Sequence, residues 1–380
     1  MKQYKQLFSQ FLESPHKHFA AHSHHYWPDV SLKATTDYWQ LSKEKVDQKW
    51  GEIFGPKLKE LRQLISKQLG FKKSEQLVFA SSTHELVYRV LSCYFGKKIK
   101  ILTTDSEFYS FKRQAYRLQE VGAVELIEVP LEPFDNFEER FLQTAQQESH
   151  DFVFLSHVFF NSGYVVDLDQ TLKELTQNTP PVFIDGYHGF MAVPFDFSKY
   201  EDKIFYTAGA YKYAASGEGC CFMYVPSNFT LDPVYTGWFA GFNELSSEFT
   251  QVHFPKDAQR FMGSTMDYTP MFRLKAYLSE LESKNISLSE IQQYINSLKE
   301  FFIENLSRSK YAFLNEDTLL LPPGLCGQFL SFKMATEELC KGAHEQLSKD
   351  RIITDYRGCV LRIGFGIYHD QEDLETFFKT

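Results

Sequence analysis

The sequence lacks any run of about 18 consecutive apolar residues, the length that a helix needs to cross a bilayer. Its first residues also lack the apolar core of a secretory signal peptide. Six cysteines are present, but they show no CxxC spacing and no disulfide framework. These absences predict a cytoplasmic protein with reduced thiols and no membrane-spanning segment.

Positive charge is also scarce, because 40 Lys and Arg residues face 49 Asp and Glu residues. The net charge is −9, and the sequence contains no basic block. This balance argues against nucleic acid and against an anionic membrane surface as the main partner. Hydrophobic residues, by contrast, are plentiful. Hydrophobic residues make up 43% of the 380 residues, which is enough for two domains.

Short apolar runs alternate with segments of helical spacing from residue 77 onward. The runs with the composition of strands are 77–82, 98–105, 124–130, 151–158, 181–188, 203–209 and 220–226. The intervening segments with helical spacing are 83–95, 110–122, 136–147 and 169–177. This alternation predicts an α/β fold with a mostly parallel, seven-stranded sheet covered by helices on both faces.

The regions on either side of this pattern differ from it in character. Residues 38–69 and 271–306 show helical spacing, and strand-like runs follow at 329–334 and 360–368. The change near residue 270 predicts a second, smaller α+β domain. The expected divisions are an N-terminal segment near the active site and the small domain (1–45), a large domain (46–270) and a small C-terminal domain (271–380).

Two stretches carry the candidate chemistry, FIDGYHGF at 183–190 and AGAYKYAASGEG at 208–219. The first ends an apolar strand with Asp185, and the second places Lys212 before a glycine-rich loop. In such sheets ligands bind beyond the carboxyl ends of the strands, which is where both residues fall. Spacing alone leaves a second interpretation open, in which Asp185 caps a loop and Lys212 is a solvated surface lysine.

Together with other motifs, these stretches resemble class V enzymes that depend on pyridoxal 5′-phosphate (PLP), and among them kynureninases. The matching stretches, in order, are Asp185 with His188, Tyr211–Lys212–Tyr213, Gly237–Trp238–Phe239, and VLRIGFGIYH at 360–369 with Arg362 and Tyr368. The ordered match spans roughly residues 15 to 370. The resemblance implies the PLP-dependent transferase fold of type I, similar to aspartate aminotransferase. It also implies PLP as the cofactor and an amino acid as the small-molecule substrate.

By this resemblance Lys212 forms the Schiff base with PLP, and Asp185 pairs with the pyridinium nitrogen. The carboxylate keeps that nitrogen protonated, so that the ring accepts electrons from the substrate. The lysine needs a desolvated amine with a lowered pKa. Tyr211 would bond the cofactor phosphate or protonate intermediates. His188 would help to hold Asp185 or the ring, although alone it would be interpreted as a structural histidine.

The phosphate of PLP also needs a binding site. Ser82 and Thr83 lie where a strand passes into a helix, whose free N–H groups and dipole favour a phosphate. The alternative is an ordinary N-cap, for which Ser and Thr are preferred. Trp238 matches a family residue that reaches the phosphate, and Thr265 lies in an MGST loop that matches a cap from the neighbouring subunit. The resemblance therefore implies a homodimer with shared active sites.

An aromatic or histidine side chain usually stacks on the PLP ring in this class. Phe108 occupies the place where many class V enzymes have a stacking histidine. Kynureninases instead put a Phe where this chain has Thr104. We predict that Phe108 stacks on the ring; the alternative is a plain core aromatic.

Arg362 lies in an apolar strand, and a buried arginine needs an anion. The predicted partner is the α-carboxylate of the substrate, bound by a planar two-pronged contact. The alternative is an internal salt bridge. Arg357 is a second candidate for the carboxylate, and Trp50 and Trp238 are predicted to line a pocket for an aromatic substrate.

The stretch HKHFAAHSHHYWPD at 16–29 holds five histidines within ten residues. Neither a cysteine nor an ordered carboxylate accompanies them, so we predict no metal site. Kynureninases have a G-N-S-L-G loop that approaches the substrate at this place, and here A-H-S-H replaces it. His22 and Ser23, with His24, are therefore predicted to contact the substrate.

The predicted reaction is the hydrolysis of L-kynurenine to anthranilate and L-alanine. Class V transamination, or a PLP-dependent lyase reaction on a different amino acid, stays open because these activities share the Lys and the Asp. Cysteine desulfurase is a weaker alternative, since it needs a cysteine on a mobile loop and Cys326 is the one loose candidate. A cofactor-free scaffold of the same fold is disfavoured by the intact Lys212 and Asp185.

Overall fold

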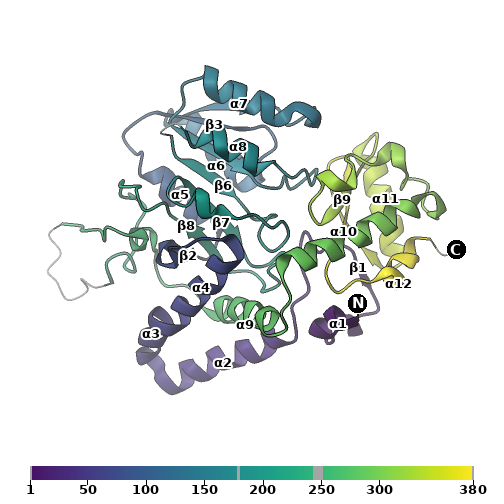
Figure 1. Cartoon of the computed structure of the whole chain (residues 1–380), viewed down its shortest axis with the longest axis horizontal. Coiled ribbons are helices and arrows are strands. Elements are labelled where there is room, and N and C mark those ends of the chain that lie inside the picture. Colours follow the sequence, from purple (N-terminus) through teal and green to yellow (C-terminus); the bar gives the residue numbers. More distant parts are fainter. Residues whose placement is uncertain (1, 178–179, 243–250, 379–380) are drawn as a thin grey trace.

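A seven-stranded sheet forms the centre of the protein in a computed structural model that describes residues 2–177, 180–242 and 251–378 (Figure 1). The strand order is β2-β8-β7-β6-β5-β3-β4. The strands are β2 (Leu77–Ala80), β3 (Ile99–Thr104), β4 (Val124–Val129), β5 (Phe152–Ser156), β6 (Val182–Asp185), β7 (Ile204–Gly209) and β8 (Cys221–Tyr224). Among these strands β8 alone is antiparallel to its neighbours, β2 and β7. The predicted α/β fold with a mostly parallel sheet is confirmed.

The apolar composition of the strands explains why layers cover both faces of the sheet. Every residue of β2, β5, β7 and β8 is buried, as expected for strands without a solvated face. In the edge strand β4 only the two end residues are fully buried. The helices between the strands are α5 (Thr83–Ser92), α6 (Tyr109–Glu120), α7 (Phe137–Gln147) and α8 (Leu168–Leu175). Each begins and ends within three residues of its predicted bounds.

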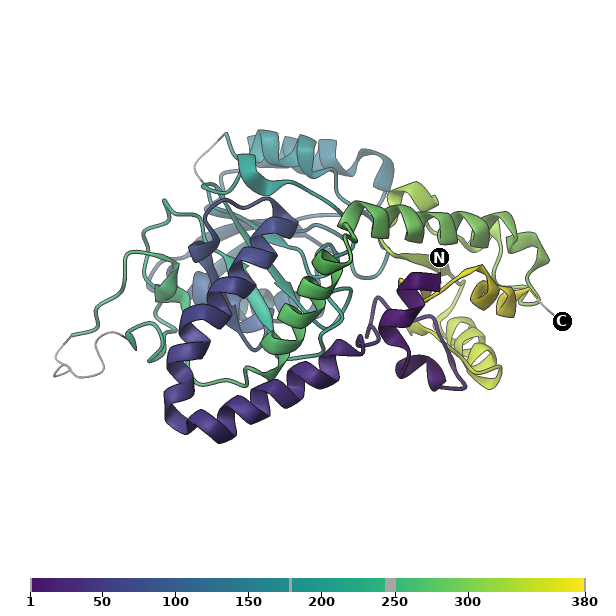
Figure 2. The same ribbon diagram turned by 60° about the horizontal axis from the view of Figure 1, so that its bottom comes forward.

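The helical region that the sequence indicates at 38–69 is not one continuous helix. It comprises α2 (Val30–Lys45), α3 (Lys49–Glu52), a π-helical stretch (Ile53–Lys57) and α4 (Leu58–Leu69). The chain turns at Val46, whose φ is +48°, and again at Gly55 and Pro56, because proline removes a backbone donor. Figure 2 shows α2 running along one side of the molecule, with α9 (Thr269–Ser283) packed between it and the large sheet.

The predicted helical region at 271–306 divides into α9 and α10 (Leu288–Glu304). The break lies at Asn285, which has a left-handed φ of +53°, and Ser287 then caps α10 through a capping box with Glu290. α9 packs against α2 and α4, whereas α10 packs against α12 (Gln371–Leu374). The change of neighbours therefore falls between α9 and α10. The domain limit near residue 270 stays a prediction.

A smaller, three-stranded antiparallel sheet has the order β11-β12-β9. Its strands are β9 (Phe329–Lys333), β11 (Asp355–Arg357) and β12 (Val360–Gly364), and α10, α11 (Glu337–Lys349) and α12 gather around it (Figure 1). The N-terminal segment reaches this region, because β1 (Lys17–His18) pairs with β10 (Ile352–Ile353) and α1 (Lys2–Lys5) lies nearby. Across the described residues, every helix is too short or too polar to cross a bilayer.

Candidate active site

Lys212 and Asp185 lie at the same edge of the large sheet. Asp185 ends β6, and Lys212 lies in the loop that follows the neighbouring strand β7. The side chain of Lys212 is only 5% exposed, and its Nζ contacts Nε2 of His188. Lys212 is therefore not a solvated surface lysine, whereas Asp185 does accept the Tyr187 N–H in the loop that follows β6.

Burial determines the charge of the lysine. Desolvation lowers the pKa of Lys212 to about 7, against the negative charge of Asp185, which raises it. Desolvation also raises the pKa of Asp185, while the Tyr187 N–H, which donates to its Oδ1 at 2.9 Å, opposes that change. A large share of the Lys212 amine is therefore unprotonated near neutral pH, the form that attacks an aldehyde.

Neutral and aromatic groups surround this amine. Burial, followed by the charge of Lys212, lowers the pKa of His188 well below its ordinary value, so its imidazole is neutral. The ring centroid of Tyr187 is 4.9 Å from the Lys212 Nζ, and that of Tyr211 is 5.8 Å away. Burial raises the pKa of Tyr211 to about 12, so this residue stays a phenol that can donate a proton.

The loop that carries Lys212 has a constrained backbone. Gly217 has a φ of +71°, and a Cβ at this position would lie 2.4 Å from the Trp27 ring. The N-terminal segment packs on the same loop, because the His25 N–H donates to the Tyr211 carbonyl at 3.2 Å. The N-terminal segment therefore contacts the loop that carries Lys212 through His25.

The start of α5 lies at the same sheet edge, since β2 runs parallel to β7. Ser82 is the N-cap of α5 and its hydroxyl accepts from the Glu85 N–H at 3.2 Å; Thr83 is the first helical residue. The hydroxyl of Ser82 therefore caps the helix. The remaining N–H groups of the first turn of α5 have no acceptor within the helix and point out of its N-terminal end. Both interpretations are compatible with this geometry, and phosphate binding stays a prediction.

Phe108 lies next to the amine. Its ring centroid is 5.7 Å from the Lys212 Nζ, and the side chain is 38% exposed, so it is not a plain core aromatic. Its ring contacts Phe160 edge-to-face at 5.3 Å. Thr104, by contrast, is fully buried, and its hydroxyl donates to Glu107 at 3.0 Å. Stacking of Phe108 on a cofactor ring stays a prediction.

Glu107 is a buried residue of the site that the sequence analysis did not single out. Its carboxyl group accepts from the backbone N–H of Ser156 at 3.2 Å and from the hydroxyl of Thr104 at 3.0 Å. Burial raises its pKa to about 8, and the negative charge of Asp185 contributes in the same direction. The sequence feature that could have identified Glu107 is its position just after β3, at the edge of the sheet where ligands bind.

Arg362 is buried in β12 and already holds an anion of this chain. Its Nε donates to Oδ1 of Asp355 at 2.9 Å, its Nη2 donates to Oδ2, and its Nη1 donates to the carbonyl of Phe160. This is the internal salt bridge that the sequence left open as the alternative. Binding of a substrate carboxylate by Arg362 stays a prediction, and Asp355 is a residue that the sequence analysis missed.

His22 is held by a carboxylate of the small sheet. Its side chain is fully buried, and its Nε2 bonds Oδ1 of Asp355 at 2.6 Å. His22 therefore acts on the site at least through Asp355, and its contact with a substrate stays a prediction. Ser23 is partly buried and its hydroxyl bonds Nδ1 of His24 at 3.2 Å; its contact with a substrate is untested.

The remaining predicted residues form a separate group. The indole N–H of Trp238 donates to the hydroxyl of Thr265 at 3.1 Å. Trp50 packs against Phe239 and Tyr268, with ring centroids 6.0 and 5.8 Å away. Within the described part of the chain, no hydrogen bond or aromatic contact links Trp50, Trp238 or Thr265 to Lys212. Their placement in a site shared between two subunits stays a prediction.

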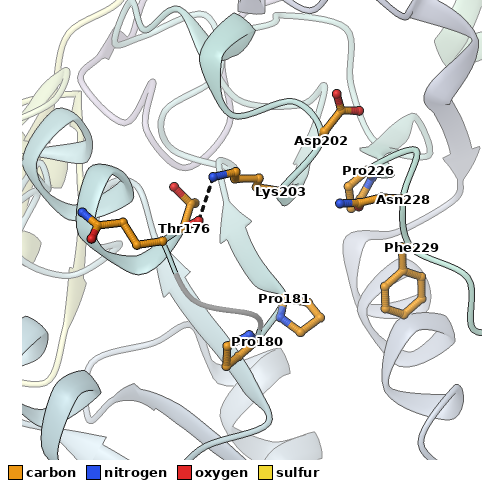
Figure 3. A pocket seen from close by; sticks show the side chains of 9 residues that line it. Thr176, Pro180, Pro181, Asp202, Lys203, Pro226, Asn228 and Phe229 are labelled. Carbon is orange, nitrogen blue, oxygen red and sulfur yellow. Dashed lines mark hydrogen bonds between the residues drawn. The ribbon is translucent and has the colours of Figure 1, made fainter.

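Two other features were considered as sites. A cavity of about 370 Å³ lies at the amino ends of β6 and β7, where Lys203 donates to the Thr176 carbonyl at 2.9 Å (Figure 3). That edge is opposite to Lys212 and is not where such sheets bind ligands. In the described residues, no group of three or more His, Cys, Asp or Glu side chains is arranged to hold a metal ion.

The mostly parallel seven-stranded sheet and the small antiparallel sheet next to it have the architecture of the PLP-dependent transferase fold of type I. The chain belongs to the Aminotransferase class-V family, whose model matches residues 26–319. Comparison with solved structures agrees. The cysteine desulfurase of Thermococcus onnurineus NA1 has a TM-score of 0.83 at 17% identity, covering 99% of this chain and 96% of that one. A PLP-bearing structure of the protein C-DES has a TM-score of 0.80 at 17% identity, covering 98% and 97%.

Among curated relatives, an uncharacterized aminotransferase of Bacillus subtilis (strain 168), YcbU, is 23% identical over 381 residues. That match covers 98% of this chain and 95% of the relative. A kynureninase of Geobacillus thermodenitrificans is 26% identical over 188 residues, covering 47% of this chain and 43% of the relative. The likeness to kynureninases is therefore partial in length.

Proposed function

We infer that this chain is a PLP-dependent enzyme that acts on an amino acid, and we propose the hydrolysis of L-kynurenine to anthranilate and L-alanine as its reaction. The observation that carries the proposal is the buried amine of Lys212, which lies against His188 within the field of Asp185. The cofactor is PLP, in agreement with the resemblance: the family is class V, and C-DES, a structural neighbour, carries PLP.

The residues present fit this cofactor. Asp185 uses Oδ1 for the Tyr187 N–H, and in the described part of the chain its Oδ2 receives no hydrogen bond. An acceptor is thus free for a protonated ring nitrogen. Nδ1 of His188 is likewise buried without a partner among the described residues. The N-terminus of α5 offers N–H groups and a positive dipole end to a phosphate.

PLP supplies an electron sink when it is bound. Lys212 would hold its aldehyde covalently and then accept the proton from the substrate Cα, because burial lowers the pKa of the amine to about 7 and leaves a large share of it unprotonated at neutral pH. Asp185 would hold a proton on the ring nitrogen. Tyr211, a phenol at neutral pH, would donate a proton in the later steps, a role that typically contributes ~10²–10⁴-fold in rate.

Two observations support L-kynurenine as the substrate. The motif series that includes Tyr211–Lys212–Tyr213 resembles kynureninases, and the partial matches to two curated kynureninases agree with it. In addition, the rings of Phe108, Tyr187 and Tyr211 all lie within 6 Å of the Lys212 Nζ, which suits a substrate with an aromatic ring.

Transamination is the second candidate, because the relative that matches over nearly the whole chain is described as an aminotransferase. Cysteine desulfurase is less well supported, although several structural neighbours have that activity. The thiol of Cys326 is buried, and burial raises its pKa to about 11. A buried, protonated thiol is a poor nucleophile.

The test is to incubate the PLP-loaded protein with L-kynurenine and to follow anthranilate by its fluorescence. Parallel arms use 3-hydroxykynurenine, cysteine, and alanine with a keto acid. We expect anthranilate with L-alanine from kynurenine, none from Lys212→Ala, and an unchanged yield from the matched control Lys33→Ala, a lysine of α2 that is 79% exposed. Amino transfer to the keto acid without anthranilate would replace hydrolysis by transamination. Full activity of Lys212→Ala would refute the assignment of the lysine.

A further inference from the structure

We propose that Lys299 is a positioning residue whose ammonium group fills a cation site built from backbone carbonyls of residues 323–327. By holding this segment, the ammonium group sets the start of β9, and with it Phe329, against the active site. The cation site itself rests only on contacts within this chain. Its effect on Lys212 rests on the proposed function, since that step assumes that PLP binds there.

Lys299 is a buried cation that is held by carbonyl oxygens. It lies on α10 and is only 1% exposed. Its Nζ donates to the carbonyls of Pro323, Cys326 and Gly327 at 3.0, 2.8 and 2.8 Å. An ammonium group has three N–H donors, so all of them are used. Among the described residues, no Asp or Glu lies within ion-pair distance of Lys299, so three carbonyl dipoles take the place of a counter-ion.

These ligands indicate which kind of ion the site fits. Backbone carbonyls are the groups with which potassium channels replace the hydration shell of K⁺, whereas Ca²⁺ and Mg²⁺ sites use carboxylates. Burial lowers the pKa of Lys299 to about 8, so most of the amine carries its positive charge at neutral pH. The site thus has the chemistry of a monovalent-cation site, and the ammonium group of the chain itself is the occupant.

The loop that follows β5 holds the same segment from another side. The Val165 N–H donates to the Leu325 carbonyl at 3.0 Å, and the Gly327 N–H donates to the Gly163 carbonyl at 2.9 Å. This loop lies at the carboxyl edge of the large sheet, where the active site is. Residues 323–327 are therefore fixed between α10 and that edge.

Phe329 connects this segment to Lys212. It begins β9, shortly after residues 323–327, and is fully buried. A Cβ on Gly163 would lie 3.2 Å from its ring, so the ring packs closely on that glycine. Its ring centroid is 5.6 Å from that of His188, whose Nε2 contacts the Lys212 Nζ. A displacement of 323–327 would therefore move the aromatic wall behind His188.

The cation site is tested by emptying it. Lys299→Ala should lower the urea midpoint of unfolding by about 1 M, because three buried carbonyls lose their donors. Potassium chloride should restore part of this loss, whereas choline chloride at the same concentration should not, since choline is too large to enter. The midpoint of the wild-type protein should be the same in both salts. Lys341→Ala, at a lysine of α11 that is 63% exposed, is the matched control and should behave like the wild type.

Equal midpoints of Lys299→Ala in the two salts would overturn the cation site, and so would an equal gain of the wild-type protein in potassium chloride. If Lys299→Ala folds in neither salt, Lys299→Met decides, because methionine fills the space without a cation. A wild-type midpoint in Lys299→Met would then overturn the proposal, and a midpoint lowered by about 1 M would support it.

The positioning role is tested by the pH dependence of PLP uptake by the apoprotein. A looser wall at His188 admits water and relieves the desolvation that lowers the pKa of Lys212. The midpoint of the uptake rate should therefore rise by about 0.5 pH unit or more in Lys299→Met. The charged residues that act most on the Lys212 amine are the same in this variant: Asp185, Arg362, Asp355 and Arg357.

An unchanged pH midpoint in Lys299→Met would overturn the positioning role and leave Lys299 a role in stability alone. A wild-type apoprotein that takes up no PLP would instead refute the proposed function, and the positioning role with it. The salt dependence of unfolding needs no cofactor, so it tests the cation site in either case.

Discussion

At the scale of single residues, the properties of Lys212 follow from where it is buried. A lysine in water holds its proton until well above neutral pH, but desolvation in this loop lowers the pKa to about 7. The neutral His188 contacts the Lys212 amine without adding charge. The negative charge of Asp185 opposes deprotonation, and it is the largest contribution to the pKa of Lys212 after burial.

The lowered pKa of Lys212 predicts that the rate of PLP binding increases with pH. The apoprotein should take up PLP through the unprotonated amine, so the rate should rise as pH passes through about 7 and then level off. In Asp185→Asn the charge that raises the lysine pKa is gone, and the midpoint should move to lower pH. Stopped-flow absorbance between about pH 5 and pH 9 measures both. A rate that keeps rising towards the ordinary lysine pKa would contradict this account.

Sequence reasoning identified some site residues and missed others for physical reasons. Asp185 and Lys212 could be found because each follows a recognisable strand and lies in a short motif. Asp355 could not, because its partnership with Arg362 depends on the antiparallel register of β11 and β12. The same limit applies to His22, whose partner is 333 residues away in the sequence.

At the scale of elements, the start of α5 has two roles to separate, helix capping and phosphate binding. Ser82→Ala removes the cap and should lower the free energy of unfolding by about 1 kcal/mol. Ser82→Asp keeps a good cap but adds a negative charge, so stability should stay within about 0.5 kcal/mol while the Kd of PLP rises at least about tenfold. Chemical denaturation and PLP titration measure the two effects.

An unchanged Kd of PLP in Ser82→Asp would mean that the cap is the only role of this residue. Ser287→Asp at the start of α10 is the matched control, because Ser287 is also a serine N-cap but belongs to a capping box far from Lys212 in the sequence. It should leave the Kd of PLP unchanged. If only Ser82→Asp raises the Kd of PLP, the added carboxylate acts locally at the phosphate site. If both variants raise it, the added negative charge acts on the protein as a whole.

The existence of the elements was easier to predict than their breaks. The strands and helices from 77 to 226 follow the apolar pattern, because buried strands and amphipathic helices differ in period. The turn at Val46 needed tertiary information, since valine rarely adopts a positive φ. The break between α9 and α10, by contrast, had a local signal, because Ser287 and Glu290 have the spacing of a capping box.

At the scale of the whole molecule, the N-terminal segment connects the two sheets. Its strand β1 pairs with β10, which lies near the small three-stranded sheet. The backbone N–H of His25 donates to the carbonyl of Tyr211 in the loop that carries Lys212. The segment also supplies His22, which holds Asp355. The division of the chain at residue 45 stays a prediction.

A site shared between two subunits makes a specific prediction for mixtures of variants. Lys212→Ala and Trp238→Ala should each be nearly inactive, since each removes one part of both sites. If Trp238 serves the neighbouring subunit, a reassociated equal mixture should regain about a quarter of wild-type activity. Half of the dimers would be mixed, and each would contain one complete site. No recovery, or a protein that sediments as a monomer, would contradict the shared site.

The central claim is that the Lys212 amine forms the covalent bond to PLP. The most direct measurement is to reduce the PLP-loaded protein with borohydride, digest it and locate the phosphopyridoxyl group by mass spectrometry. The account predicts one modified peptide, with the added mass on Lys212. A modification at another lysine, or an unmodified protein that still turns over its substrate, would contradict it.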